Sequence, residues 1–92
     1  MRKIALSLLI ISFLSTSSLS AVTMAQYEQV KTRMSYADVI AILGTPDQEL
    51  SRSEIGGINT VMYMWKGTSL GGNMNVMLQD GYVVNKAQFG LK

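Results

Sequence analysis

The sequence predicts a very small α+β domain. Residues 60–89 have the pattern of three short strands, and the dipeptide Asp80-Gly81 predicts a tight turn between the last two. Two short amphipathic segments with helix start signals precede them, between residues 23 and 43. A chain of 92 residues has room for one domain. We therefore expect a single domain over residues 22–92, after an N-terminal segment of different character.

The first 21 residues have the composition of a secretory signal peptide. Residues 1–3 include two basic side chains, residues 4–14 are almost wholly apolar, and residues 15–21 are mostly small. An apolar stretch of about eleven residues is too short to cross a bilayer as a helix, which takes roughly 20. We expect cleavage after Ala21, with Ser20 and Ala25 as alternatives, and hence a periplasmic or secreted protein.

The composition of residues 22–92 excludes several classes of function. This part of the chain has six acidic and six basic residues, so it lacks the positive surface that nucleic acid or an anionic membrane would need. The chain contains neither cysteine nor histidine, which excludes thiol nucleophiles, Ser-His-Asp triads and the usual zinc ligand sets. We expect no catalytic activity, no cofactor, no metal ion and no lipid anchor on a cysteine.

The small size of the domain limits its core. A chain of this length buries only about 60% of the surface that its unfolded state exposes. Without cysteine it has no disulfides to compensate. We expect its stability to come from apolar packing, helped by a binding partner or by a second copy in a homo-oligomer.

Two helices are expected at the start of the domain. The first covers residues 23–31: Thr23 can cap it, and Gln26 three residues later completes a capping box. The second begins after Ser35 and ends at Gly44, where a left-handed residue is favoured. The apolar face of this second helix consists of Tyr36, Val39, Ile40 and Leu43.

Four strands are expected after the helices. Residues 48–55 predict an edge strand, and Gly56-Gly57 a hairpin turn. Residues 59–66 predict a central strand that is apolar on both faces. The Gly-rich loop 67–72 lacks the Gly-Lys-Ser/Thr ending and the following helix of a phosphate-binding loop, so we expect an ordinary connection. The faces of the central strand hold Val61, Tyr63 and Trp65 on one side and Thr60, Met62 and Met64 on the other.

The final hairpin, residues 73–89, allows two registers. A type I′ turn at 80–81 pairs 79/82, 78/83, 76/85 and 74/87, which places Phe89 on the same side as Val76. A type I turn with a bulge at Gly81 turns the last strand over. That second register leaves Met77, Val83, Ala87 and Phe89 outside. The polarity of the side chains favours the first register.

The methionines allow one further hypothesis. Met62 and Met64 share a strand face, and Met74 and Met77 lie on the next strand. Thioethers are soft ligands that suit Cu(I), so a copper carrier is conceivable. Met74 and Met77 point to opposite sides of their strand, however. We therefore favour methionines that fill the core or form an adaptable binding face.

Four stretches resemble known families. Ala25-Gln-Tyr-Glu-Gln-Val and the run Met34-Ser-Tyr-Ala-Asp-Val-Ile-Ala-Ile-Leu-Gly resemble the helical signature shared by the BamE (SmpA/OmlA) outer-membrane assembly lipoproteins and the repeats of beta-lactamase inhibitor protein. Residues 60–67 and 79–92 are similar to a small bacterial family of that superfamily without an assigned function. Two differences stand out. Arg33 occupies a position that is usually glycine, which predicts a wider turn between the helices, and the lipobox cysteine of BamE is missing.

The resemblance implies two helices packed on one face of a four-stranded antiparallel sheet, with the opposite concave face free to bind another protein. The aromatic positions that carry binding in the inhibitor correspond to Asn75, Met77, Ala87 and Phe89, of which only Phe89 is aromatic. That correspondence requires the bulged register. The implied function is a BamE-like, non-enzymatic binding module whose partner is an envelope or secreted protein. An inhibitor of a secreted enzyme of the beta-lactamase type is the alternative.

Overall fold

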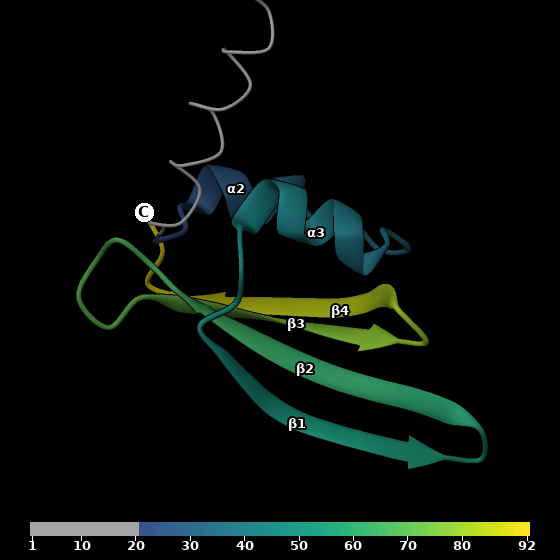
Figure 1. Cartoon of the computed structure of the whole chain (residues 1–92). Helices are drawn as coiled ribbons and strands as arrows, with labels where there is room; N and C mark the ends of the chain where they lie inside the picture. The colour runs from purple at the N-terminus through teal and green to yellow at the C-terminus, as the bar shows by residue number, and fades with distance from the viewer. Residues whose placement is uncertain (1–20) are drawn as a thin grey trace, which may run out of the picture.

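The computed structural model describes residues 21–92, so the predicted signal peptide lies outside the described residues except for Ala21. Two helices lie over one face of a four-stranded antiparallel sheet (Figure 1). The strands follow one another across the sheet in chain order. This confirms the predicted α+β fold. The elements are α2 (Met24–Gln29), α3 (Tyr36–Leu43), β1 (Gln48–Ile55), β2 (Ile58–Lys66), β3 (Asn73–Gln79) and β4 (Tyr82–Phe89).

The predicted capping box of α2 is present. The Thr23 hydroxyl accepts a hydrogen bond from the backbone N–H of Gln26 (3.2 Å), and the Gln26 side chain accepts one from the backbone N–H of Thr23 (2.8 Å). The helix ends at Gln29, two residues earlier than predicted. The reason is Val30, which has extended backbone angles and is completely buried.

The predicted limits of α3 are confirmed. The Ser35 hydroxyl accepts a hydrogen bond from the backbone N–H of Asp38 (3.2 Å), and Gly44 ends the helix with a φ of 84°. Val39 and Leu43 are the buried residues of this helix. No helix within residues 21–92 has both the length and the apolar character to cross a membrane.

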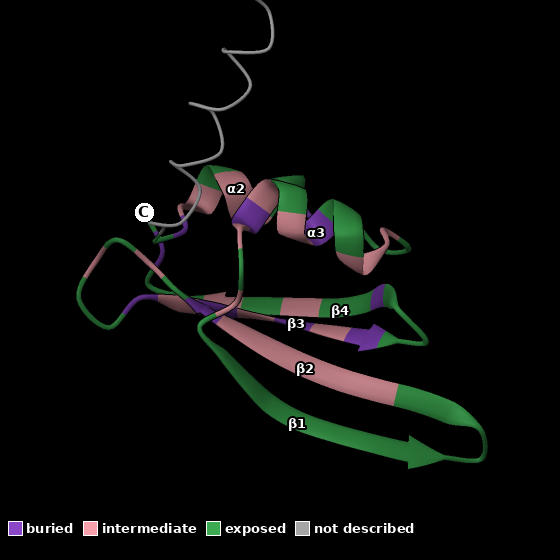
Figure 2. Ribbon diagram, in the orientation of Figure 1, coloured by how far each residue is buried: buried purple, intermediate pink, exposed green. Residues whose placement is uncertain are grey.

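The core lies between the helices and the two middle strands (Figure 2). Trp65 on β2 is 1% exposed, and Met74, which is opposite it on β3, is completely buried. The indole N–H of Trp65 donates to the carbonyl of Gly44 (2.9 Å), which joins β2 to the end of α3. The remaining buried apolar residues are Val22, Val30, Val39, Leu43, Val76, Leu78, Val83 and Leu91.

Both ends of the described chain are hydrogen-bonded into this core. The N–H of Val22 donates to the carbonyl of Lys66 (2.9 Å), and the N–H of Met24 donates to the carbonyl of Lys92 (3.0 Å). Val22 is completely buried and Leu91 is 7% exposed. The first and last described residues therefore meet at one end of the sheet.

The final hairpin combines features of both predicted registers. Asp80 (φ 51°) and Gly81 (φ 89°) form the predicted two-residue turn, and the pairs 79/82 and 78/83 are confirmed. Val84 is then an extra residue in β4, a β-bulge, so that Met77 pairs with Asn85. Beyond it, residue 76 pairs with 86 and 74 with 88. The predicted pairs 76/85 and 74/87 are wrong, and the bulge is at Val84, not at Gly81.

Polar residues on the helix side of β4 explain why the polarity argument failed. The Lys86 ammonium donates to the carbonyl of Tyr27 (2.8 Å) and lies 4.1 Å from the centroid of its ring. Burial lowers the pKa of Lys86, and the nearby Lys31 lowers it further. The Gln88 side chain accepts a hydrogen bond from the N–H of Leu91. Lys86 and Gln88 therefore both have hydrogen-bond partners on the helix side of the sheet, where the polarity argument had placed Ala87 and Phe89.

Arg33 lies in the turn between the helices and has a φ of 80°. It adopts the left-handed conformation that the glycine of the family signature would supply, so no wider turn is needed. Its N–H donates to the carbonyl of Val83, and the N–H of Val83 donates to the carbonyl of Met34 (both 2.8 Å). These bonds hold the turn against the edge of β4.

We predict that Arg33→Gly stabilises the protein by about 0.5–1 kcal/mol. A left-handed non-glycine residue costs about 1–2 kcal/mol, and the greater freedom of glycine in the unfolded chain offsets part of that gain. Urea denaturation followed by the fluorescence of Trp65 measures the difference. Arg33→Ala is the control: it keeps the strained backbone and should gain nothing. An equal gain in both variants would assign the effect to the side chain instead.

Candidate functional site

The sheet face that points away from the helices, here called the open face, is not covered by any described element. Because side chains alternate along a strand, it holds the residues of β2 that lie between the core-facing Val61, Tyr63 and Trp65. The register adds the residues opposite them: Met62 pairs with Met77, and Met64 pairs with Asn75. The central positions of the open face are Thr60, Met62, Met64, Asn73, Asn75, Met77, Asn85, Ala87 and Phe89.

The four residues that the family resemblance singled out lie together on this face. Asn75 is opposite Ala87, Phe89 is opposite Asn73, and Met77 follows Asn75 on the same side of β3. The bulge at Val84 produces this arrangement, because it reverses the facing of the following residues. Phe89 is 73% exposed, whereas Met77 and Asn75 are half-buried. The structure thus groups all four side chains, and their role in binding stays a prediction.

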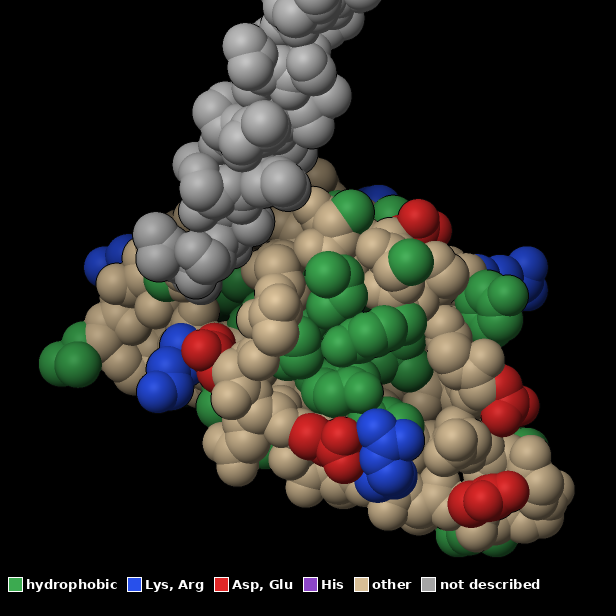
Figure 3. Space-filling model, in the orientation of Figure 1, with side chains coloured by type: hydrophobic (Ala, Val, Ile, Leu, Met, Phe, Trp, Pro, Cys, Tyr) green, Lys and Arg blue, Asp and Glu red, His purple; other side chains and the backbone are tan. Residues whose placement is uncertain are grey.

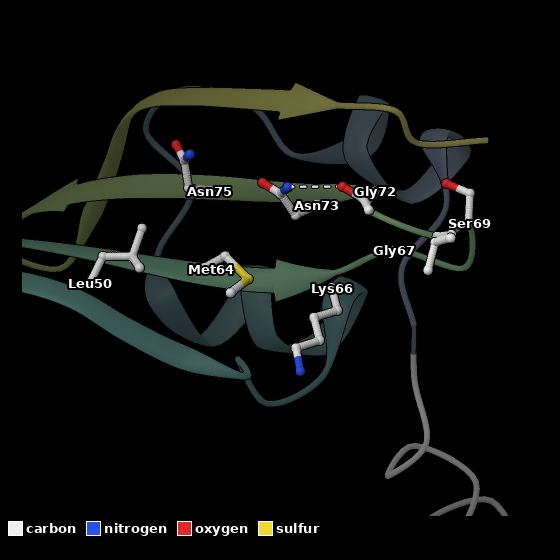
Figure 4. Close-up of a pocket in the computed structure, with 10 residues that line it drawn as sticks. Leu50, Met64, Lys66, Gly67, Ser69, Gly72, Asn73 and Asn75 are labelled. Atoms are coloured by element: carbon white, nitrogen blue, oxygen red, sulfur yellow. Dashed lines mark hydrogen bonds between the residues drawn. The ribbon is translucent and has the colours of Figure 1, made fainter.

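A groove of about 570 Å³ runs between the open face and the loop 67–72 (Figure 4). Leu50 and Met64 supply apolar side chains, and the amides of Asn73 and Asn75 lie beside them. The loop forms one end of the groove. It is held by hydrogen bonds within itself and to the chain end, from Gly67 N–H to the Gly72 carbonyl, from the Asn73 amide to the Gly71 carbonyl, and from the Ser69 hydroxyl to the Gly90 carbonyl.

The groove depends on the close approach of the loop to the chain end. A Cβ atom on Gly72 would lie 2.5 Å from the Ser69 hydroxyl oxygen and 2.9 Å from the Gly90 carbonyl oxygen. No side chain fits at that distance, so position 72 requires glycine. The predicted ordinary connection between two strands is therefore a tightly packed one.

A second, smaller hollow of about 200 Å³ lies on the helix side, between α3 and the β1–β2 hairpin. Figure 3 shows hydrophobic side chains gathered in this gap. The rings of Tyr36 and Tyr63 stack there with centroids 5.1 Å apart. Burial raises the pKa of Tyr36, and the neighbouring Tyr63 and Glu49 raise it further. The sequence analysis missed this hollow, because nothing local in the sequence shows that the hairpin extends beyond the helices.

An ion pair borders this hollow. The Arg52 guanidinium donates from Nε to Glu49 Oε2 (3.0 Å) and from Nη2 to Glu49 Oε1 (2.9 Å). The same Nη2 lies 3.4 Å from the Tyr63 hydroxyl oxygen. The hydrogen bond from Arg52 lowers the pKa of Glu49. Both side chains are about half exposed, so the pair contributes little to stability.

The described residues contain no cluster of metal-ligating side chains. Within residues 21–92, no three His, Cys, Asp or Glu side chains lie close enough to hold a metal ion. Every buried side-chain nitrogen or oxygen of this region has a hydrogen-bond partner. Of the four methionines considered for copper, Met74 is in the core, whereas Met62, Met64 and Met77 share the open face. Such a face is suited to binding another macromolecule, because methionine adapts to different shapes.

Comparison with known proteins agrees with this geometry. The family model described as "Beta-lactamase inhibitor (BLIP)" matches residues 20–92. The chain belongs to the BLIP family. A search of curated proteins finds no match. Among solved structures, a Streptococcus mutans protein provisionally described as a beta-lactamase inhibitor protein is 25% identical, with a TM-score of 0.69. The match covers 82% of this BLIP-family chain and 49% of the other, so the chain spans about half the length of that protein.

We predict that Phe89 contributes little to the stability of this BLIP-family domain. Because its side chain is 73% exposed, Phe89→Ala should change the free energy of unfolding by less than about 0.5 kcal/mol. Met74→Ala, on the opposite face of the same sheet, should cost about 2–5 kcal/mol because Met74 is completely buried. Thermal and urea denaturation measure both values. Similar losses in the two variants would mean that Phe89 is packed in the core.

Proposed function

We propose that this BLIP-family protein is an exported, non-enzymatic binding module of the cell envelope that holds a partner protein on its open face. The observation that carries this proposal is the concentration of exposed apolar side chains there. Exposed apolar patches of this kind mark interaction surfaces, because a soluble monomer gains nothing by displaying them. Six of the seven large exposed hydrophobic residues face this side or line its groove: Leu50, Ile55, Ile58, Leu70, Tyr82 and Phe89.

The chemistry of the open face fits a protein partner. Its positions on β3 and β4 are amides, methionine, tyrosine, alanine and phenylalanine, and none of them is charged. On β2, the one charged residue of this face is Lys66, which lies at the end next to the loop 67–72. Charged residues are likewise depleted at the centre of protein interfaces, where aromatic residues and methionine are enriched. Phe89 would enter an apolar pocket of the partner. Asn73 and Asn75 would bond to its backbone, since an amide side chain both donates and accepts.

The family membership favours a second candidate, inhibition of a secreted enzyme of the beta-lactamase type. The description of the family and that of the Streptococcus mutans protein both name this activity. The open face would then cover the active site of the enzyme, and inhibition would be competitive with substrate. A BamE-like role in outer-membrane assembly rests on the helical signature at residues 25–44 alone.

Site-specific crosslinking tests the use of the open face. A photo-crosslinkable phenylalanine analogue in place of Phe89 should give a discrete adduct with an envelope protein in the native host. The same analogue in place of Gln29, which is exposed on α2 on the other side of the molecule, should give none. Adducts at position 29 alone would show that the partner binds to the helices instead. The absence of adducts at both positions would contradict the proposal.

A titration of secreted hydrolases separates the inhibitor from other binding modules. If the protein is an inhibitor, a beta-lactamase in the panel should lose activity in proportion to the protein added. Phe89→Ala should then weaken inhibition about 10-fold or more, as truncation of an interface anchor does, while Gln29→Ala leaves it unchanged. If no enzyme loses activity, the inhibitor candidate is wrong, and adducts from position 89 would still support an envelope partner.

We propose that the signal peptide is residues 1–21 and that the mature domain is residues 22–92. Cleavage after Ala21 or Ser20 keeps the buried Val22 and the Thr23 capping box, whereas cleavage after Ala25 would remove both. N-terminal sequencing of the exported protein should therefore read Val22 first, or Ala21 for the alternative. A first residue of Gln26 would contradict this assignment, and an uncleaved chain retained in the cytoplasm would contradict export.

A further inference from the structure

The two edges of the sheet differ in how they are protected. The edge of β4 is bulged at Val84, and the turn before α3 bonds to it: Arg33 and Val83 donate to carbonyls across the gap, and Tyr36 N–H donates to the Gly81 carbonyl (2.9 Å). No described segment pairs with the outer edge of β1, and all of its residues are exposed. Its own bulge is at Leu50. After it, residues 51–55 pair regularly with β2 and include no proline, and their two charged side chains, Arg52 and Glu54, are of opposite sign.

The geometry of the β1–β2 hairpin determines which backbone groups are free at this edge. Ile55 and Ile58 flank the two-residue turn, and such a flanking pair exchanges hydrogen bonds. Bonded and non-bonded pairs alternate along a strand. Ser53 and Ser51 therefore point their backbone groups toward β2, whereas Glu54 and Arg52 point theirs outward. A strand that joins this edge must bond to Arg52 and Glu54.

Charge selects one antiparallel arrangement for a second copy of the same strand. If Arg52 were opposite Arg52 of the other copy, or Glu54 opposite Glu54, like charges would face each other directly, which is destabilising. The intermediate register places Arg52 of each copy opposite Glu54 of the other, so two pairs of opposite charge form at once. Ser53 then lies opposite its counterpart on the two-fold axis.

We propose that a second copy of this chain pairs with the first along β1, antiparallel and centred on Ser53. Within residues 21–92, the Nη1 group of Arg52 has no hydrogen-bond partner, so the guanidinium can bind the Glu54 of the other copy without releasing its own Glu49. Ile55, which is 77% exposed, then lies beside Ser51 of the other copy, next to its exposed Leu50.

The pairing joins two four-stranded sheets into one sheet of eight strands. With strands about 4.8 Å apart and about 23 Å long, one open face presents roughly 450 Å². A stable protein interface buries roughly 800 Å² on each partner, close to what two joined faces present. The chain also spans 49% of the Streptococcus mutans protein, so two copies would match its length. The pairing of the two β1 strands does not depend on the proposed function. The use of the joined open faces to bind a partner rests on that function.

Sedimentation equilibrium of the purified protein tests the pairing without any binding partner. The wild-type protein should approach the mass of two chains as its concentration rises to about 1 mM. Glu54→Arg alone should stay a monomer, because its strand then carries arginine at both outward positions. Arg52→Glu alone should also stay a monomer, because its strand carries glutamate at both. Glu28→Arg makes the same charge change on α2, far along the chain from β1, and should dimerise like the wild type.

The decisive sample is an equimolar mixture of Glu54→Arg and Arg52→Glu. All facing charges are then complementary, so the mixture should form a heterodimer although neither variant associates alone. Circular dichroism confirms that each variant is folded. A wild-type protein that keeps the mass of one chain at every concentration would overturn the proposal. So would dimers of both single variants, because they would place the contact elsewhere.

Discussion

The hydrogen bond from the indole of Trp65 to the carbonyl of Gly44 determines how the helices lie on the sheet. Trp65 fills the centre of the core from β2, and Gly44 is the residue where α3 ends. An unpaired indole N–H in the core would cost about 1–3 kcal/mol, so the end of α3 is held at a fixed place over β2. Met74 and the two buried residues of α3, Val39 and Leu43, belong to the same core cluster. With no cysteine to form a disulfide, the fold depends on this one-sided core.

Because the core lies on one side of the sheet only, the residues of the open face are not part of it. The three residues of β3 that face the helices, Met74, Val76 and Leu78, are all buried in the core. The residues between them on β3, among them Asn75 and Met77, face the other side and are only half-buried. They can therefore change without loss of the fold. In this BLIP-family chain they provide methionine and amides, a combination that favours adaptable contacts over rigid ones.

The local signals of the sequence predicted the fold well, because they arise from neighbouring residues. The capping box at Thr23, the end of α3 at Gly44 and the turn at Asp80-Gly81 each depend on residues within a few positions of one another. The facing of β4 depends instead on contacts between distant residues. Lys86 can lie beneath α2 because its ammonium group donates a hydrogen bond to the carbonyl of Tyr27. No local sequence pattern shows that contact. The side of the sheet that Phe89 occupies followed from the family resemblance, whereas side-chain polarity placed it on the wrong side.

The hydrogen bond between Met24 and Lys92 makes the last described residues part of the folding unit. Met24 begins α2 and donates to the carbonyl of Lys92, while Leu91 fills the core next to Gly67. Removal of Leu91 and Lys92 would thus uncover the core and release the first turn of α2 together. Residues 91 and 92 therefore stabilise both the core and α2, and their loss would affect the whole domain.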